Sequence, residues 1–366
     1  MTHDTLIIGA GVSGLSAAFA LLTRGHAITL IERGEVGNES SWAGGGILSP
    51  LQPWDHPESL ARLALRSMAT YADWVAEIEA TGGGDAEYWR CGMLTLNVGK
   101  GALAWCAAHD MAVEPAALCS FTLPPQGSGD HALWLPNVAQ VRNPRLVAAL
   151  RAAVEARGGR VIAHCAATGV RTQSGRVTAV ETTAGTFAAD AVVLATGAWS
   201  GLGLPALACV PNVRPIRGQM LLFKLEPGVL DTILYRDGLY LIPRRDGHVL
   251  VGSTLEDVGF DKTTDAATCA HLHATAAELL PVLSAMQPVR HWAGLRPGAP
   301  DNIPIIDRHP DFDNVFVNSG HFRYGVTLAP ASAELLVALM EGATPPLDAA
   351  SYGWQAAQDR AWSGCS

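Results

Sequence analysis

The sequence predicts an α/β protein in which a parallel-sheet domain carries an inserted, mostly antiparallel β domain. Residues 5–31 contain a buried strand, a glycine turn, a helix and a second strand, and so short a stretch is typical of a strand–helix–strand unit with parallel strands. From Arg214 onward, short strands separated by Pro, Gly and Asp predict an antiparallel sheet. A chain of 366 residues has room for two domains of about 150 residues each.

The N-terminal unit has the glycine pattern of a dinucleotide-binding site. Gly9-Ala10-Gly11-Val12-Ser13-Gly14 follows a strand predicted over 5–8 and opens a helix predicted over 15–22. The first glycine permits a tight turn, the second lets the backbone approach a pyrophosphate, and the third lets helix and strand pack closely. Glu32 ends the second strand, where a carboxylate accepts hydrogen bonds from ribose hydroxyls. We therefore predict a Rossmann-like domain whose helix N-terminus binds phosphate; the alternative is a glycine turn followed by an unrelated acid.

The segment from Ser40 to Pro50 is consistent with two interpretations. Its sequence is Ser-Ser-Trp-Ala-Gly-Gly-Gly-Ile-Leu-Ser-Pro. Three consecutive glycines allow the backbone to pass close to a flat ring or a phosphate, and Ser40 and Ser41 carry hydroxyls that can bond phosphate. A flexible loop fits equally well, because Gly and Ser are common loop residues.

Hydrophobic periodicity and turn residues place the remaining elements and the domains. Further helices are predicted over residues 57–80, from Asn143 to the Gly158-Gly159 pair, over 266–280 and over 328–341. Further strands are predicted over 160–166, 169–173, 176–182, 191–196, 219–224, 239–243 and 248–252. The predicted domains are a nucleotide-binding domain of residues 1–85, 143–210 and 294–345, a substrate domain of residues 86–142 and 211–293, and a C-terminal tail of residues 346–366.

Composition excludes several classes of partner. The formal net charge of −9 argues against binding to nucleic acid or to an anionic membrane. The apolar run from Leu6 to Leu22 is interrupted by three glycines and has no basic flank, so neither a signal peptide nor a membrane span is expected. Seven cysteines without a CxxC pair and twelve histidines without ligand spacing predict no metal site. The number of cysteines is odd and their spacing is irregular, which suits unpaired thiols in a reducing cytoplasm.

Seven segments of the chain, in this order, resemble the glycine oxidases of thiamine biosynthesis, in the D-amino-acid oxidase group of flavoproteins. They are Gly9 to Gly14, Glu32, Ser40 to Pro50, Val141 to Leu146, Ala195 to Trp199, Gly294 to Gly298 and Gly320 to Gly325. The resemblance spans nearly the whole chain, and its specific parts are the Ser-Ser-Trp-Ala-Gly-Gly-Gly and Gly-His-Phe-Arg blocks. It implies a D-amino-acid oxidase-like fold with FAD bound non-covalently, since residues 294–298 lack the cysteine to which some related sarcosine oxidases attach flavin.

The resemblance also implies the chemistry. Glycine or another small amino acid, such as sarcosine or a small D-amino acid, loses a hydride from Cα to flavin N5. The resulting imine hydrolyses to a keto acid and ammonia, and dioxygen reoxidises the flavin to give hydrogen peroxide. The partners implied are the amino acid and dioxygen, with no nucleic acid and no membrane, in a cytoplasmic homo-oligomer.

Three residues are predicted to act on the substrate. Arginine pairs both oxygens of a carboxylate through its planar fork, and Arg296 lies in a segment made rigid by Pro297; the alternative is a surface ion-pair arginine. By resemblance, the loop that holds Arg323 lies against the flavin, and Tyr240 is the tyrosine that covers the substrate. The alternative for Arg323 is an exposed arginine at the start of a helix. Tyr240 is also consistent with an ordinary strand tyrosine. His321 is interpreted as a hydrogen-bonded loop histidine, since hydride transfer from a neutral amine needs orientation and no strong base.

The predicted cofactor contacts come from the glycine motif, the second strand, the Ser40–Gly46 block and the Gly-His-Phe-Arg loop. They are Gly9, Gly11, Val12, Ser13, Gly14, Glu32, Arg33, Ser40, Ser41, Ala43, Gly44, Gly45, Gly46, Val170, Gly197, Trp199, His321, Phe322, Arg323, Tyr324, Gly325, Val326 and Thr327. At Tyr324 the chain departs from the family, which usually has asparagine there, and this leaves the side-chain preference of the pocket open.

Two other functions remain consistent with the sequence. A dehydrogenase of similar fold would pass electrons to a quinone instead of dioxygen, and peroxide formation on adding glycine separates the two. A non-catalytic flavin-binding module would hold flavin that no amino acid bleaches.

Overall fold

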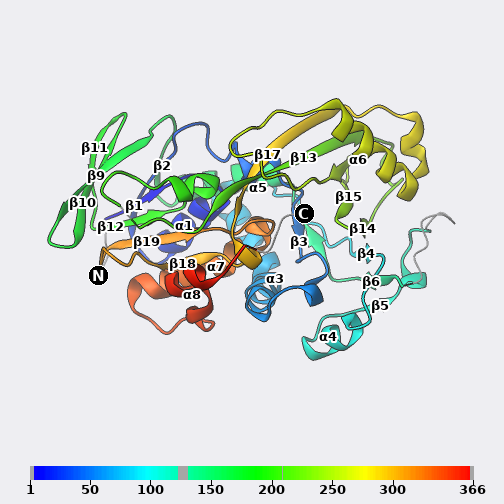
Figure 1. Ribbon diagram of the computed structural model, residues 1–366, viewed down its shortest axis with the longest axis horizontal. Helices are drawn as coiled ribbons and strands as arrows, with labels where there is room; N and C mark the ends of the chain where they lie inside the picture. The colour runs from blue at the N-terminus through cyan, green and yellow to red at the C-terminus, as the bar shows by residue number, and fades with distance from the viewer. Residues whose placement is uncertain (1–3, 123–130, 208, 363–366) are drawn as a thin grey trace.

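A six-stranded sheet forms one end of the molecule, and an eight-stranded sheet forms the other (Figure 1). The structure is a computed structural model that describes residues 4–122, 131–207 and 209–362. The first sheet has the order β18-β19-β12-β1-β2-β8, in which only β18 runs antiparallel to its neighbour. Its strands are β1 (Asp4–Ile8), β2 (Ala27–Ile31), β8 (Arg160–Ile162), β12 (Ala191–Leu194), β18 (Ile305–Arg308) and β19 (Val315–Ser319).

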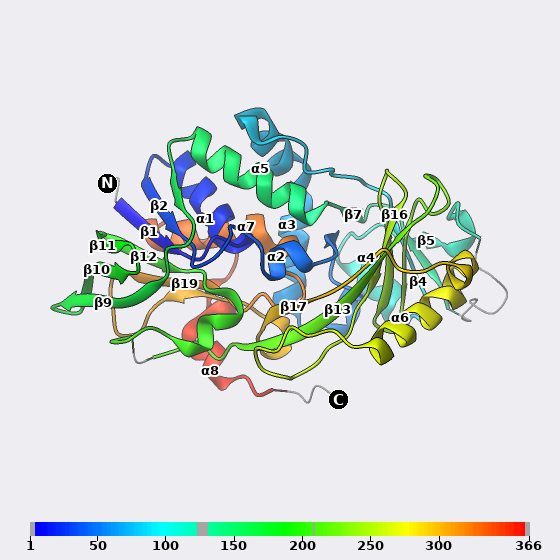
Figure 2. The ribbon, with the colours of Figure 1, turned by 90° about the horizontal axis from the view of Figure 1, so that it is seen from above.

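Each face of this sheet is covered by a different layer, because successive strand residues point to opposite sides. Ile7 packs into a core shared with four helices, whereas Leu6 and Ile8 pack against a three-stranded antiparallel sheet. Figure 2 shows α1 and α5 on one side of β1 and β2, and β9 and β10 on the other. The covering elements are α1 (Val12–Thr23), α3 (Glu58–Ile78), α5 (Asn143–Ala156), α7 (Gly325–Glu341), β9 (Ala167–Gln173), β10 (Arg176–Thr182) and β11 (Gly185–Ala188).

The second sheet has the order β17-β13-β16-β15-β14-β4-β6-β5 and is antiparallel except where β14 pairs with β4. One face of this sheet packs against α6 (Ala266–Leu279), where Leu241 of the sheet and Leu272 of the helix belong to the same buried cluster. Its strands are β4 (Met93–Thr95), β5 (Glu114–Pro115), β6 (Leu133–Leu135), β13 (Arg214–Lys224), β14 (Ile233–Arg236), β15 (Leu239–Pro243), β16 (His248–Gly252) and β17 (Arg290–Gly298).

The chain also contains several short helices and one short strand pair outside the larger sheets. Strand β17 runs across residue 294, where the sequence placed a domain boundary, so the domain limits remain predictions. The short elements are α2 (Ser40–Ala43), α4 (Ala102–Ala108), α8 (Trp354–Asp359), the 3-10 helix η4 (Gly197–Leu202) and the pair β3 (Ile47–Leu48) and β7 (Ala139–Gln140).

The strand predicted over 160–166 is wrong in its second half. Strand β8 ends at Ile162, and the chain then turns, with His164 at a φ of +54°. Local hydrophobicity did not reveal this turn, because Val161, Ile162 and Ala163 form one apolar run. The strands predicted over 239–243 and 248–252 coincide with β15 and β16. Among the described residues, no helix is long and apolar enough to cross a membrane.

Candidate active site

A cleft of about 350 Å³ is lined by residues of both sheets and of the helices between them. Most of the predicted site residues lie on its wall. They are Gly9, Gly11, Val12, Ser13, Glu32, Arg33, Ser40, Ser41, Gly44, Gly45, Gly46, Gly197, Trp199, Tyr240, Arg296, His321, Phe322, Arg323, Tyr324, Gly325, Val326 and Thr327.

Three predicted cofactor contacts lie behind the cleft wall. Gly14 packs against β1, where an added Cβ would lie 1.9 Å from the Gly9 carbonyl oxygen. The carbonyl of Ala43 faces away to accept a hydrogen bond from Trp292 Nε1 at 3.1 Å. Val170 pairs with Val180 in the three-stranded sheet and packs into the small core under the six-stranded sheet. The cleft is instead lined in this region by Cys165, Ala166 and Ala167, at the start of β9.

The N-terminus of α1 opens into the cleft, and its N-cap residue, Gly11, has no side chain to cap it. Gly9 has a φ of +106°, and an added Cβ there would lie 2.3 Å from the Ala195 carbonyl oxygen, so the turn requires glycine. Ser41 Oγ accepts a hydrogen bond from the Val12 amide at 2.9 Å, and a Cβ at Gly11 would lie 3.0 Å from the same oxygen. The helix start therefore presents backbone amides and a positive dipole end, which together favour a phosphate.

The end of β2 adds an acid and an aromatic surface to the cleft. Glu32 accepts hydrogen bonds from the backbone amides of Ala10 at 2.9 Å and Gly34 at 3.0 Å, one on each carboxylate oxygen. Each oxygen has a second lone pair that can accept a hydroxyl. The Arg33 guanidinium lies 3.5 Å from the centroid of the Trp199 ring, so the two form a flat cation–π surface on the cleft wall.

The three glycines of the second block form a packed segment of the cleft wall. A Cβ at Gly45 would lie 2.5 Å from Ile242 Cδ1, and one at Gly46 would lie 2.1 Å from a backbone carbonyl oxygen. Arg244, which is only 5% exposed, donates to the Gly45 carbonyl oxygen at 2.8 Å. Asn143 donates to the Ser41 carbonyl at 3.0 Å, and its buried Oδ1 has no partner among the described residues. The cleft therefore contains an acceptor that a bound group can satisfy.

Arg296 projects from β17 toward Tyr240 at the substrate-domain end of the cleft. Its Nη2 donates to Ser253 Oγ at 2.6 Å, and its Nη1 donates to the Thr254 carbonyl oxygen at 3.0 Å. Burial is the main cause that lowers the pKa of Arg296, and the charge of Arg323 lowers it further. Among the described residues, neither arginine forms an ion pair, so each guanidinium at this end of the cleft lacks an acidic partner.

Tyr324 and His56 form a polar pair next to these cations. Tyr324 Oη lies 2.7 Å from His56 Nε2, and the two rings meet edge to face. Burial and then the charge of Arg323 lower the pKa of His56 to about 4. Burial raises the pKa of Tyr324 to about 12. At neutral pH both side chains are therefore uncharged.

His321 is held in the way that the sequence analysis proposed. It is 1% exposed, its Nδ1 lies 3.3 Å from Ser13 Oγ, and its Nε2 lies 3.1 Å from Ser332 Oγ. Burial lowers its pKa to about 4. The ring therefore joins the α1 start to α7 as a neutral group.

Comparison with known proteins decides the family. The family model described as "FAD dependent oxidoreductase" matches residues 4–339. A glycine oxidase of Pseudomonas putida is 43% identical over 358 residues, which make up 96% of this chain and 98% of the relative. The chain belongs to the FAD-dependent oxidoreductase family.

Two further relatives agree with this assignment. A bifunctional ThiO/ThiG protein of Trichormus variabilis is 33% identical over an alignment of 357 positions that covers 92% of this chain and 52% of that protein. The crystal structure of glycine oxidase from Geobacillus kaustophilus matches with a TM-score of 0.86 and 28% identity, covering 96% of this chain and 98% of that one. The predicted fold class and the predicted cofactor are confirmed.

The cleft of this FAD-dependent oxidoreductase fits its cofactor. The uncapped α1 start suits a pyrophosphate, Glu32 suits a ribose, and the closely packed Gly44–Gly46 segment with the unpaired Asn143 Oδ1 suits a flat ring with N–H donors. FAD, when bound, supplies the hydride acceptor. Residues 294–298, where some related sarcosine oxidases attach flavin, contain no cysteine. The cysteines that line the cleft, Cys165 and Cys209, lie elsewhere in the chain.

Sequence reasoning missed four residues of the site: His56, Arg244, Ser253 and the side chain of Asn143. Asn143 was noted only as a helix start, and its amide in fact joins α5 to the Ser41 carbonyl. Ser253 and Arg244 act through contacts with residues more than 40 positions away, and no local spacing predicts such contacts.

Proposed function

We propose that this enzyme oxidises glycine or another small amino acid, with its carboxylate bound by Arg296. The observation that carries the proposal is the pair of guanidinium groups, Arg296 and Arg323, which line the same cleft as the glycine turn and have no acidic partner among the described residues. A partly buried cation without a counter-ion favours an anionic ligand, because the ligand offsets the cost of removing the cation from water.

Each of the three substrate residues has a separate role. Arg296 binds the carboxylate through its fork, and Tyr240, which is 7% exposed and lies beside Arg296, covers the substrate. Arg323 adds positive charge at the start of α7, whose positive dipole end also faces the cleft. The positive region stabilises negative charge on the reduced cofactor.

The proposal requires no protein base. The pKa values of about 4 for His56 and His321 leave both rings neutral, and they are already hydrogen-bonded to other protein groups. The substrate must therefore enter with a neutral amine, or lose its proton to water, before hydride leaves Cα. Orientation in the cleft then supplies most of the catalysis.

The relatives named glycine oxidase and ThiO support glycine as substrate and a place in thiamine biosynthesis. On this proposal dioxygen accepts the electrons and gives hydrogen peroxide, and the imine product hydrolyses to glyoxylate and ammonia. We also expect a cytoplasmic homo-oligomer, with the chain divided into the two domains and the tail given above.

The test is a screen of anaerobic flavin bleaching with glycine, sarcosine and D-alanine, followed by admission of air. The proposal expects loss of the oxidised flavin absorbance with at least one of these amines, and one mole of peroxide per mole of flavin reoxidised. Bleaching that only a quinone reverses would assign a dehydrogenase. Flavin that none of the amines bleaches would overturn the proposed oxidation altogether.

A further inference from the structure

We infer that Glu256 is a positioning residue that fixes Arg296 in the geometry needed to bind the substrate carboxylate. Glu256 lies on the segment between β16 and α6, outside the wall of the cleft, and it acts through Ser253 and Thr254. The inference rests on the proposed role of Arg296, and the experiment below separates failure of the one from failure of the other.

The Arg296 guanidinium is held by a backbone carbonyl and a hydroxyl, and by no acid among the described residues. Its Nη1 donates to the Thr254 carbonyl oxygen at 3.0 Å, and its Nη2 donates to Ser253 Oγ at 2.6 Å. It lies flat on the bare backbone of β13, because a Cβ at Gly218 would approach Nη1 to 2.0 Å. The position of the guanidinium therefore depends on where residues 253 and 254 lie relative to β13.

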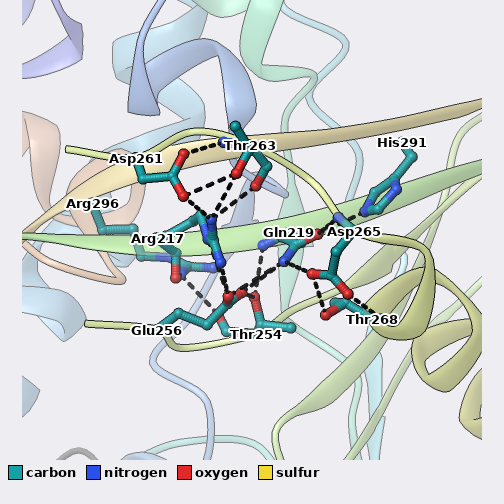
Figure 3. A network of polar contacts seen from close by, with 10 residues as sticks. All are labelled: Arg217, Gln219, Thr254, Glu256, Asp261, Thr263, Asp265, Thr268, His291 and Arg296. Carbon is teal, nitrogen blue, oxygen red and sulfur yellow. Dashed lines mark hydrogen bonds and ion pairs between the residues drawn. The ribbon is translucent and has the colours of Figure 1, made fainter. Parts of the chain in front are cut away.

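The carboxylate of Glu256 ties residues 253–256 to β13 (Figure 3). Its Oε2 accepts from Arg217 Nε at 3.0 Å and from Arg217 Nη2, and its Oε1 accepts from Gln219 Nε2 at 3.0 Å and from Thr254 Oγ1. Thr254 Oγ1 in turn accepts the Gln219 backbone amide at 2.9 Å. Four donors from three residues thus converge on one carboxylate that is two residues from the contacts of Arg296.

Backbone hydrogen bonds also join residue 256 to β13. Arg217 and Glu256 exchange both backbone hydrogen bonds, at 2.9 and 3.0 Å, in an isolated antiparallel bridge. Arg217 also donates to Asp261 at 2.8 Å, and Gln219 donates to Asp265 at 3.0 Å. The whole segment between β16 and α6 is therefore fastened along one side of β13, as Figure 3 shows.

The network has the burial and charge expected of a fixed structural element. Arg217 is 8% exposed and Gln219 is fully buried. Burial raises the pKa of Glu256, but the bonds from Arg217, Thr254 and Gln219 outweigh it, so the pKa is lowered overall and the carboxylate stays ionised. A neutral amide at position 256 would turn an N–H group toward donors, which breaks at least two of the four bonds.

A small displacement at Arg296 affects binding strongly, because bidentate recognition requires both nitrogens in place. Glu256→Gln is therefore expected to weaken carboxylate binding about tenfold, which corresponds to about one lost hydrogen bond to a charged group. Glu256→Asp keeps the charge and shortens the side chain, so it should weaken carboxylate binding less than Glu256→Gln does.

The experiment measures the dissociation constant of acetate, a carboxylate that cannot be oxidised, from the change in flavin absorbance of the purified holoenzyme. Glu256→Gln should raise this constant about tenfold, and it should raise KM for glycine by a similar factor while kcat falls less than about threefold. Glu278→Gln is the matched control: Glu278 pairs with Arg236 at 2.6 Å in the same domain, away from Arg296, and its variant should bind acetate like wild type.

A double-mutant cycle decides whether the effect passes through Arg296. In the Arg296→Lys background, which retains a cation, Glu256→Gln should change the acetate constant less than about twofold. The inference would be overturned if Glu256→Gln raised the acetate dissociation constant tenfold in both backgrounds, or if it left that constant unchanged in the otherwise wild-type enzyme. If Arg296→Lys alone leaves acetate binding unchanged, the proposed substrate site is wrong.

A second variant covers the case in which Glu256→Gln fails to fold. Thr254→Val removes only the hydroxyl that links Glu256 to the Gln219 amide and preserves the side-chain shape. It should weaken acetate binding about threefold, with an unchanged melting temperature of the holoenzyme as evidence of folding. Wild-type acetate binding in a folded Thr254→Val protein would contradict the inference.

Discussion

Replacing the buried Arg244 with methionine is expected to destabilise the protein and to weaken FAD binding. Its guanidinium donates to the Val141 carbonyl at 2.9 Å, to the Gly45 carbonyl at 2.8 Å and to Gln140 Oε1. These bonds join the residue that follows β15 to β7, to Val141 just after β7, and to the glycine segment of the cleft wall. Methionine fills a similar volume but leaves all three acceptors without this donor.

Two opposing contributions set the magnitude. Burial lowers the pKa of Arg244 from 12.5 to about 10, and at about 1.36 kcal/mol per pKa unit the charge costs about 3 kcal/mol in its site. Hydrogen bonds from a charged donor contribute about 1.5–3 kcal/mol each, so the loss of three removes about 4.5–9 kcal/mol. The free energy of unfolding should therefore fall by about 1.5–6 kcal/mol, and FAD should bind at least about tenfold more weakly.

The assay compares urea unfolding of the apoprotein and FAD titration for wild type, Arg244→Met and Arg244→Lys. The lysine variant keeps the charge and loses the fork, so it should be destabilised as well and should rescue FAD binding only in part. A methionine variant that unfolds at the wild-type urea concentration and binds FAD normally would refute the assigned role.

Three further predictions concern the cleft. Tyr324→Asn removes the bond to His56 and the ring that lines the cleft, so kcat/KM for D-alanine relative to glycine should rise at least about threefold; an unchanged ratio would show that the ring does not limit the substrate. His321, with a pKa of about 4, and Tyr324, with a pKa of about 12, do not change charge between pH 7 and 10. In this range kcat/KM should rise as the substrate amine loses its proton, and the midpoint of the rise should shift when a substrate whose amine has a different pKa is used. The pKa of His321 is about 4 in the folded state and 6.5 in the unfolded chain, so protonation favours unfolding at low pH. The free energy of unfolding should therefore lose about 3 kcal/mol as the pH falls from 6.5 to 4. The urea midpoints measured at pH 7 and pH 4 should differ less in His321→Gln than in wild type.

The N-terminal half of the site was predictable because its signals are local. The turn at Gly9 and the close packing of Gly14 follow from the spacing of the glycines, and the position of Glu32 follows from the end of β2. Val170 was misplaced because strand alternation alone does not show which residues at the start of β9 face the cleft. Cys165, Ala166 and Ala167 line the cleft, and the rest of β9 then leads away from it.

The substrate half depends on contacts between distant segments. Arg296 was therefore indicated by the resemblance together with its rigid segment, and Tyr240 by the resemblance. Nothing near Glu256 in the sequence shows that its carboxylate receives Arg217 and Gln219, which lie 39 and 37 positions away. The pair of His56 and Tyr324 is separated by 268 positions and has no counterpart in a local motif. Burial, which changes the charge state of these groups, is likewise a property of the folded chain.

The most direct test of the central claim is anaerobic reduction of the enzyme by glycine in wild type and in Arg296→Ala. Loss of a buried guanidinium that pairs with a carboxylate costs about 2–5 kcal/mol, so the glycine concentration for half-maximal reduction should rise by about 30-fold or more, while flavin content stays that of wild type. Reduction at the wild-type glycine concentration in the alanine variant would contradict the account.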